Sequence, residues 1–221
     1  MPDFKTSPAA RGKKAIKELL IADDRSAIRP WLIEARNPAR LLTSYLFDDE
    51  LLVRWRAAEA LGLVAAHMAG SNNESVRRLL RRFFWMLNDE SGNFCSMAPL
   101  AIGEILRNVS ILIEEFAQLL PPFLVEEPFE AGTRLAISRI AEVRRDVFSG
   151  PTVKKLVQTL RDPDPAIRGT SLKALKALGV AIPSDKLKKL MGDDAVVEIY
   201  DFATGSMRLT TVAHLAETLY G

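Results

Sequence analysis

The 221-residue sequence has few of the side chains that build disulfides and metal sites: one cysteine, Cys95, and two histidines, His67 and His214. A single cysteine cannot form an internal disulfide, which is typical of proteins kept in a reducing compartment. One thiol and two imidazoles also fall short of a structural zinc site unless carboxylates complete it. The sequence therefore predicts no disulfide framework and no metal centre, and it favours a cytoplasmic location.

Long apolar runs and catalytic motifs are also missing. No stretch reaches the roughly 18 uninterrupted apolar residues of a membrane-spanning helix, and the first residues lack the apolar core of a signal peptide. No His-Glu dipeptide of the kind that binds iron occurs, and no histidine lies near Cys95 to activate its thiol. We therefore expect no membrane partner, no cofactor, no catalytic residue and no enzymatic activity.

The sequence does contain a repeated motif, at residues 46–62 and 160–175. Both copies have a Leu two residues before an Asp, an Arg six residues after that Asp, and an Ala-Leu pair beginning six residues after the Arg. The matching positions are Leu46, Asp48, Arg54 and Ala60-Leu61 in the first copy, and Leu160, Asp162, Arg168 and Ala174-Leu175 in the second.

Two weaker copies lie between them. Residues 87–106 keep the Asp as Asp89 and replace Ala-Leu by Ala101-Ile102, and the fourth copy is marked by Ala136-Ile137. The Ala markers at 60, 101, 136 and 174 are 41, 35 and 38 residues apart. Such a period is typical of stacked helix pairs, so the sequence predicts an all-α solenoid in which neighbouring pairs bury each other's apolar faces.

The polar positions of the repeat have a structural interpretation. The Asp in the turn is expected to cap the second helix of each pair, where its charge also favours the helix N-terminus. The Arg can reach the Asp of its own or the adjacent repeat, which predicts a ladder of ion pairs along the stack. The predicted ladder residues are Asp48, Arg54, Asp89, Asp162 and Arg168.

With these phrases in view, residues 41 to 182 resemble the HEAT-like repeats of the phycobilisome-lyase type. The phrases that carry the resemblance are "DDELLVRWRAAEALG" and "DPDPAIRGTSLKALKALG". The stretch "WMLNDESGNFCSMAPLAIGEIL" is further similar to bacterial HEAT-like proteins with an Asn-Asp-Glu-Ser-Gly turn, a subgroup for which the resemblance implies no particular activity. The resemblance implies the fold and not the function, because such repeats serve many functions.

Both ends depart from the repeat. Residues 1–40 are expected to form an N-terminal helical cap, 41–182 the repeat array and 183–221 a C-terminal cap. In this last part, the run "AVVEIYDFA", the Thr204-Gly205 turn and the run "MRLTTV" suggest a β-hairpin followed by a helix capped by Thr211. The alternative is that "AVVEIYDFA" is the second helix of a last pair.

Two sets of residues are candidates for binding a partner. Aligning the copies places Trp55, Arg56 and Glu59 against Ser96, Met97 and Leu100. An exposed inner row with Trp55, Arg56, Glu59, Met97 and Leu100 would be an apolar patch rimmed by charge, as at interaction surfaces; burial of the large apolar members by a neighbouring repeat or a terminus is the alternative. The second set is the polar turn at 88–93, with Asn88, Glu90 and Asn93, which is either a binding site or a simple turn and cap.

These features favour a protein-binding scaffold or adaptor that uses the concave face of the solenoid. One alternative is nucleic-acid binding or repair through residues 151–191, where nine basic side chains face three acidic ones, although a net charge of +2 is low for a dedicated nucleic-acid binder. The lysines concerned are Lys173, Lys176, Lys186, Lys188 and Lys189. A second alternative, implied by the resemblance, is a chromophore lyase or maturation factor.

Overall fold

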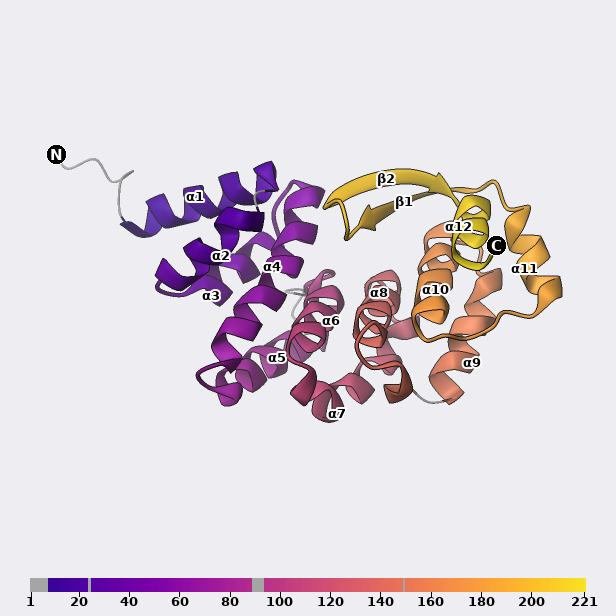
Figure 1. The fold of residues 1–221 in the computed structure, drawn as a ribbon, viewed down its shortest axis with the longest axis horizontal. Coiled ribbons are helices and arrows are strands. Elements are labelled where there is room, and N and C mark those ends of the chain that lie inside the picture. The colour runs from indigo at the N-terminus through magenta and orange to yellow at the C-terminus, as the bar shows by residue number, and fades with distance from the viewer. Residues whose placement is uncertain (1–7, 24, 89–93, 149) are drawn as a thin grey trace.

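A computed structural model of the chain describes residues 8–23, 25–88, 94–148 and 150–221. The chain is an α-solenoid closed at its C-terminal end by a β-hairpin and a helix (Figure 1). Its α-helices are α1 (Pro8–Ala22), α2 (Arg25–Glu34), α3 (Pro38–Tyr45), α4 (Leu51–Ala69), α5 (Asn73–Leu87), α6 (Ala98–Asn108), α7 (Ile113–Phe116), α8 (Glu130–Ala141), α9 (Gly150–Gln158), α10 (Pro165–Ala177), α11 (Ser184–Met191) and α12 (Val212–Tyr220). The strands are β1 (Val196–Asp201) and β2 (Ser206–Thr211), and 3-10 turns occupy Ser110–Leu112, Ala117–Leu119, Pro121–Val125, Arg145–Val147 and Thr159–Arg161. No helix in the described ranges is long and apolar enough to cross a membrane.

The second helices of the pairs form one continuous row. Helix α4 packs on α6, α6 on α8 and α8 on α10, while α5, α7 and α9 lie on the other side of the row (Figure 1). The Ala markers that gave the period, Ala60, Ala101, Ala136 and Ala174, are all buried in this row. The predicted stacking of helix pairs is therefore confirmed.

Small residues set the close approach of these inner helices. A Cβ added at Gly103 on α6 would lie 2.5 Å from the Cα of Ala136 on α8, and one at Gly62 on α4 would lie 2.8 Å from the Glu104 carbonyl oxygen on α6. Separations this short require backbone movement, because interiors are packed at crystal-like density. Glycine at these two positions therefore permits the observed packing.

The C-terminal hairpin forms as the local sequence predicts. Strands β1 and β2 pair antiparallel from Val196 opposite Thr211 to Asp201 opposite Ser206. Gly205 takes a positive φ of 65° in the turn, a conformation that glycine adopts without steric cost. The Thr211 side chain accepts a hydrogen bond from the His214 amide and caps α12. The hairpin prediction is thus confirmed over the alternative of a last helix.

The hairpin then runs back across the solenoid. Its base lies beside α10 and α12, and its turn reaches α4, so the two strands pass over the ends of α6 and α8 (Figure 1). In a solenoid each repeat normally contacts only its neighbours. The hairpin is an added element that joins the last repeat to the first.

The Asp-Arg contacts differ from the predicted ladder. The Arg54 Nε donates to the Asp48 main-chain carbonyl, and Arg168 donates to the Asp162 carbonyl at 2.7 Å, so each arginine binds the turn of its own repeat. The Asp48 and Asp162 carboxylates instead accept from backbone amides two residues ahead, both at 3.0 Å. Neither arginine pairs with an Asp side chain of another repeat within the described residues; Arg168 pairs with Asp193, just before β1, at 2.7 Å. The prediction of an ion-pair ladder is therefore wrong for these two copies. Asp89 lies outside the described residues.

The helix-capping role of the Asp was also misplaced. Asp164 is the N-cap of α10, where its carboxylate accepts from the Ala166 amide at 2.8 Å, and Asp162 stands two residues before it. The carboxylate of Asp48 pairs with Lys17 of α1 at 3.0 Å, which fastens the N-terminal cap to the first repeat. The repeated Asp therefore shapes the turn before the second helix instead of capping it.

Candidate functional site: the concave cleft beneath the hairpin

An aromatic cluster forms where the hairpin meets α4. We call residues 200–206 the hairpin tip. The Tyr200 ring stacks on the Trp55 ring with centroids 5.1 Å apart, and Phe202 meets Trp55 edge-on at 6.3 Å and Tyr200 edge-on at 5.0 Å. Stacked and edge-to-face pairs of this kind add to the stabilisation from burial alone.

Polar contacts hold the same junction. Arg56 donates from Nε to the Gly205 carbonyl at 2.9 Å and from one terminal nitrogen to the Leu20 and Ile21 carbonyls at 2.8 and 2.7 Å. The Tyr200 hydroxyl donates to a Glu59 carboxylate oxygen. Arg56 is buried, and its hydrogen bonds join three parts of the chain: the end of α1, helix α4 and the hairpin tip.

A buried ion-pair network lies on the next two inner helices. Arg139 on α8 binds both carboxylate oxygens of Glu104 on α6, with the longer contact at 3.3 Å, and also pairs with Glu142 at 2.6 Å. Burial leaves the pKa of Glu104 above its ordinary value, although the hydrogen bond and the charge of Arg139 both lower it. Burial by itself lowers the pKa of Arg139, but the hydrogen bond and charge of Glu104 outweigh it and leave that pKa raised.

The hairpin covers this network with Phe202. Its ring centroid lies 4.1 Å from the Arg139 guanidinium carbon and 5.9 Å from the Lys173 ammonium nitrogen. Lys173 also donates to the Tyr200 carbonyl at 3.3 Å, and burial lowers the pKa of its ammonium group. Cation–π contacts of this kind gain strength when they are partly removed from water.

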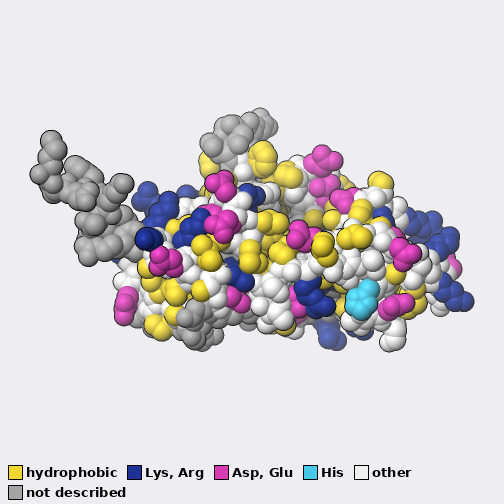
Figure 2. Space-filling view, turned by 90° about the horizontal axis from the view of Figure 1, so that it is seen from above, with side chains coloured by type: hydrophobic (Ala, Val, Ile, Leu, Met, Phe, Trp, Pro, Cys, Tyr) yellow, Lys and Arg dark blue, Asp and Glu magenta, His cyan; other side chains and the backbone are white. Residues whose placement is uncertain are grey.

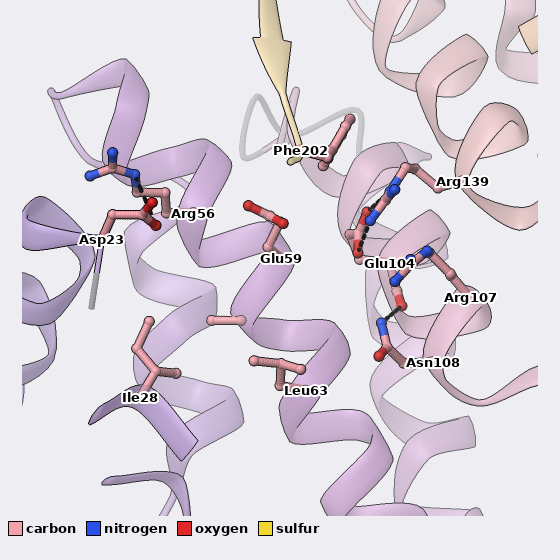
Figure 3. A pocket seen from close by; sticks show the side chains of 11 residues that line it. Asp23, Ile28, Arg56, Glu59, Leu63, Glu104, Arg107, Asn108, Arg139 and Phe202 are labelled. Atoms are coloured by element: carbon pink, nitrogen blue, oxygen red, sulfur yellow. Dashed lines mark hydrogen bonds and ion pairs between the residues drawn. The ribbon is translucent and has the colours of Figure 1, made fainter. Parts of the chain in front are cut away.

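A cleft of about 260 Å³ opens between the hairpin tip and the inner helices. Its charged lining comprises three guanidinium groups and three carboxylates: Arg56, Arg107, Arg139, Asp23, Glu59 and Glu104. Figure 3 shows Glu59 on α4 facing the Arg139–Glu104 pair, with Phe202 at the hairpin end and Leu63 further along α4. The cleft is therefore charged but balanced, with an apolar floor.

Two consecutive side chains on α6 leave hydrogen-bonding atoms free at this cleft. Arg107 uses its Nε for Glu142 at 2.7 Å, and its terminal nitrogens have no hydrogen bond within the described part of the chain. Asn108 donates from Nδ2 to the Glu104 carbonyl at 2.8 Å, and its Oδ1 is likewise uncommitted among the described residues. A donor and an acceptor side by side suit a ligand that offers both, as a peptide main chain does.

Comparison with known proteins identifies a relative of this chain. It is 35% identical over 173 residues to an uncharacterized protein from Archaeoglobus fulgidus, a match that covers 76% of this chain and 88% of that protein. The chain belongs to the same family as this archaeal protein. No family model matches it.

Solved structures give a looser likeness. A computationally designed armadillo repeat protein for modular peptide recognition is 17% identical, covers 94% of this chain and 99% of its own, and has a TM-score of 0.41. An archaeal HEAT-like repeat protein from Thermococcus onnurineus NA1 is 17% identical, covers 92% and 77%, and has a TM-score of 0.39. The names of these neighbours describe armadillo and HEAT-like repeat proteins, and at these TM-scores the likeness carries no argument about this chain. The bacterial origin and the phycobilisome-lyase type that the sequence suggested are not shown by these relatives.

The structure brings together three of the predicted partner-binding residues. Trp55, Arg56 and Glu59 all lie on the concave side of α4, but each contacts the hairpin tip of its own chain. The two members of this row that come from the second repeat are buried: Met97 is 8% exposed and Leu100 is 1% exposed. The expectation that these two line an exposed surface is therefore wrong.

The reason is the start of α6. Pro99 lies in the first turn of α6, a position where proline is favoured, and the helix begins at Ala98. The first turns of α4, which present Trp55, consequently have no helical counterpart in the second repeat. Met97 precedes α6, and Leu100 points into the core.

The polar turn at 88–93 is described only at its first residue. Asn88 ends α5 and donates from its side chain to the Phe84 carbonyl at 2.8 Å. This contact is a hydrogen bond at the C-terminus of α5, so the Nδ2 group of Asn88 is used within the fold. Glu90 and Asn93 lie outside the described residues.

The structure also places the cysteine and two of the lysines that the sequence singled out. Cys95 is buried, and burial raises the pKa of its thiol to about 11, so the reactive thiolate is disfavoured. Lys173 is held under the hairpin, which takes it away from a nucleic-acid surface, whereas Lys176 is exposed and lies 5.1 Å from the Tyr220 ring. Within the described ranges, no group of three His, Cys, Asp or Glu side chains is placed to hold a metal ion.

Sequence reasoning missed the residues that complete the cleft. Arg107, Asn108, Arg139 and Glu104 were not singled out, although Glu104 and Arg139 are charged residues within apolar helical stretches. A charge in such a stretch signals a buried pair, because unpaired charges are almost never fully buried. Phe202 gave no local signal, since its partners are far away in the chain.

Proposed function

We propose that this protein is a non-enzymatic adaptor that binds a segment of a partner protein in the concave cleft. The observation that carries the proposal is the pair of uncommitted groups on α6, the Arg107 terminal nitrogens and the Asn108 Oδ1, at a cleft walled by α2, α4, α6, α8 and the hairpin. A cleft assembled from separate repeats is how a solenoid presents a concave binding surface.

The size of the cleft supports a peptide over a cofactor. Sites for drug-sized ligands and cofactors span roughly 300–1,000 Å³. The cleft, at about 260 Å³, is smaller and has room for one or two side chains. A large chromophore would not fit without movement of the hairpin, so the volume favours the adaptor over the chromophore lyase.

The surface around the cleft is consistent with a protein partner. Figure 2 looks onto the hairpin side and shows hydrophobic side chains along its middle, with charges of both signs beside them. Leu209 and Val196 are exposed hydrophobic residues at the base end of the hairpin, beyond the cleft itself. Apolar area bordered by charge is the composition of protein interfaces. With a single cysteine, a cytoplasmic partner goes with this proposal.

The test compares two charge reversals. Arg107→Glu changes the cleft, whereas Arg82→Glu makes the same change on α5, on the far side of the inner row, where Arg82 is exposed. Proteins captured from cell extract by wild type and by Arg82→Glu should coincide, and a specific subset should be lost with Arg107→Glu. The proposal fails if all three proteins, shown by thermal melting to be equally folded, capture the same set.

A further inference from the structure

The hairpin tip already occupies the part of the concave face that the sequence assigns to a partner. Tyr200 stacks on Trp55, Gly205 accepts from Arg56, and Phe202 covers Arg139. A partner that used Trp55 or Arg56 would have to take the place of these contacts. A partner that binds Trp55 or Arg56 therefore competes with the tip for one surface.

The two ends of the hairpin are held very differently. At the base, Val212, Leu215 and Ala216 are buried in the core, and Arg168 binds Asp193 just before β1 at 2.7 Å. At the tip, residues 203 and 204 are exposed and Tyr200 is the one large side chain that is fully buried, so the junction with α4 consists of its stack on Trp55, the Phe202 edge contact and a few hydrogen bonds. Local openings start where few buried apolar contacts hold a segment. The tip can therefore leave α4 while the base stays anchored.

The tip is also an imperfect occupant of its site. The indole Nε1 of Trp55 is buried and has no hydrogen-bond acceptor among the described residues. A buried donor without an acceptor loses its interaction with water and gains nothing in return. A segment that places a carbonyl or carboxylate oxygen at this nitrogen would bind the same aromatic surface better than the tip does.

We propose that the hairpin tip is a built-in competitor for the concave site and that the partner segment shares its chemistry. The segment is an extended stretch with two aromatic side chains two residues apart, as in Tyr200-Asp201-Phe202, and an oxygen acceptor for the Trp55 indole. This inference rests on the proposed function and specifies both its partner and its control. Binding at Trp55 then requires the tip to leave α4, which also removes Phe202 from the wall of the cleft. The apparent affinity therefore depends on how often the tip is open.

The experiment uses the full chain and a fluorescent peptide of residues 197–206, "VEIYDFATGS". Fluorescence polarisation compares wild type with the double variant Tyr200→Ala/Phe202→Ala, whose own tip lacks both rings. If the tip is docked in about nine of ten wild-type molecules, it lowers the apparent affinity about tenfold, so the double variant should bind the peptide at least about tenfold more tightly. Adding Trp55→Ala to the double variant should remove this gain, and so should a peptide with alanine at positions 200 and 202.

Each outcome decides the proposal. Equal binding by wild type and a folded double variant, or equal binding of the alanine peptide, overturns it. Should the double variant not fold by circular dichroism, Phe202→Ala alone must show a smaller gain, because it removes the ring contacts of Phe202 and weakens the docking of the tip while Tyr200 stays in the fold. If the peptide does not bind but capture of partner proteins still depends on Arg107, the proposal of a competing hairpin tip is wrong and the proposed adaptor function is retained. If the peptide binds but capture of partner proteins is independent of Arg107, the proposed partner site in the cleft is wrong, while the docking of the tip on α4 is supported.

Discussion

Arg56 is the residue whose loss should separate the three parts that meet on α4. Its guanidinium donates to the carbonyls of Leu20, Ile21 and Gly205 and lies 3.6 Å from the Asp23 carboxylate. Arg56→Met keeps most of the aliphatic volume and removes every donor. The Leu20 and Gly205 carbonyls then lose the donor they have in the folded chain, while the Ile21 carbonyl lies closer to solvent.

The magnitude follows from the two buried hydrogen bonds. A hydrogen bond to a charged group contributes about 1.5–3 kcal/mol, so two predict a loss of about 3–6 kcal/mol in the free energy of unfolding. Removing a buried guanidinium also removes its desolvation cost, which moves the expected value toward the lower end, about 3 kcal/mol. A loss of this size is a large fraction of the total stability of a typical domain.

Urea unfolding and hydrogen exchange measure the effect. The matched control is Arg54→Met, two residues earlier on α4, which removes one part-buried hydrogen bond to the Asp48 carbonyl within one turn and should cost about half as much, roughly 1.5 kcal/mol. In Arg56→Met, amides of the hairpin should exchange faster than those of α6, because the tip has lost a fastening. If Arg56→Met is no less stable than Arg54→Met, or if exchange in the hairpin is unchanged, the role given to Arg56 is wrong.

Three further predictions concern packing, reactivity and pH. Gly103→Ala should destabilise the chain by about 1–3 kcal/mol in urea unfolding, because its Cβ would lie 2.5 Å from the Ala136 Cα; an unchanged midpoint would contradict the close packing. Cys95 should react with a thiol reagent at pH 8 only after unfolding, because it is buried and its pKa is raised to about 11; fast labelling of the native protein would refute this. Burial pushes the pKa of Asp48 upward, but the Glu50 amide and Lys17 outweigh it and leave that pKa below its ordinary value of 3.8. The stability from Asp48 is thus present above that value and is lost as pH falls through the lower folded pKa; Asp48→Asn should flatten this part of the stability curve, and an unchanged acid slope would count against the Lys17 pairing.

The repeat architecture was readable from the sequence because its signal is local and recurs. Ala60, Ala101, Ala136 and Ala174 mark the same buried level of successive inner helices, so their spacing reports the period directly. The hairpin and its Thr211 cap were likewise readable, since turn chemistry and capping depend on neighbouring residues.

The packing of the hairpin tip on α4 could not be predicted from the sequence. The Arg56–Gly205 and Glu59–Tyr200 hydrogen bonds join residues 149 and 141 positions apart, and no local pattern encodes such a pairing. Covering of Trp55 by a neighbouring repeat or a terminus was one of two interpretations of the sequence, but the sequence alone could not show that the hairpin supplies that covering. Met97 was misplaced for a different reason, since aligning copies by their Ala markers ignored the later start that Pro99 gives α6.

The central claim is that the chain's own hairpin tip lies on the concave face of α4. Nuclear Overhauser effects between the ring protons of Trp55 and Tyr200, whose centroids are 5.1 Å apart, test it most directly in a labelled sample of the full chain. The structure predicts clear cross-peaks between the two rings and Tyr200 ring shifts displaced by stacking on the indole. Absent cross-peaks, with Tyr200 shifts equal to those in the free peptide of residues 197–206, would show that the tip does not occupy the site.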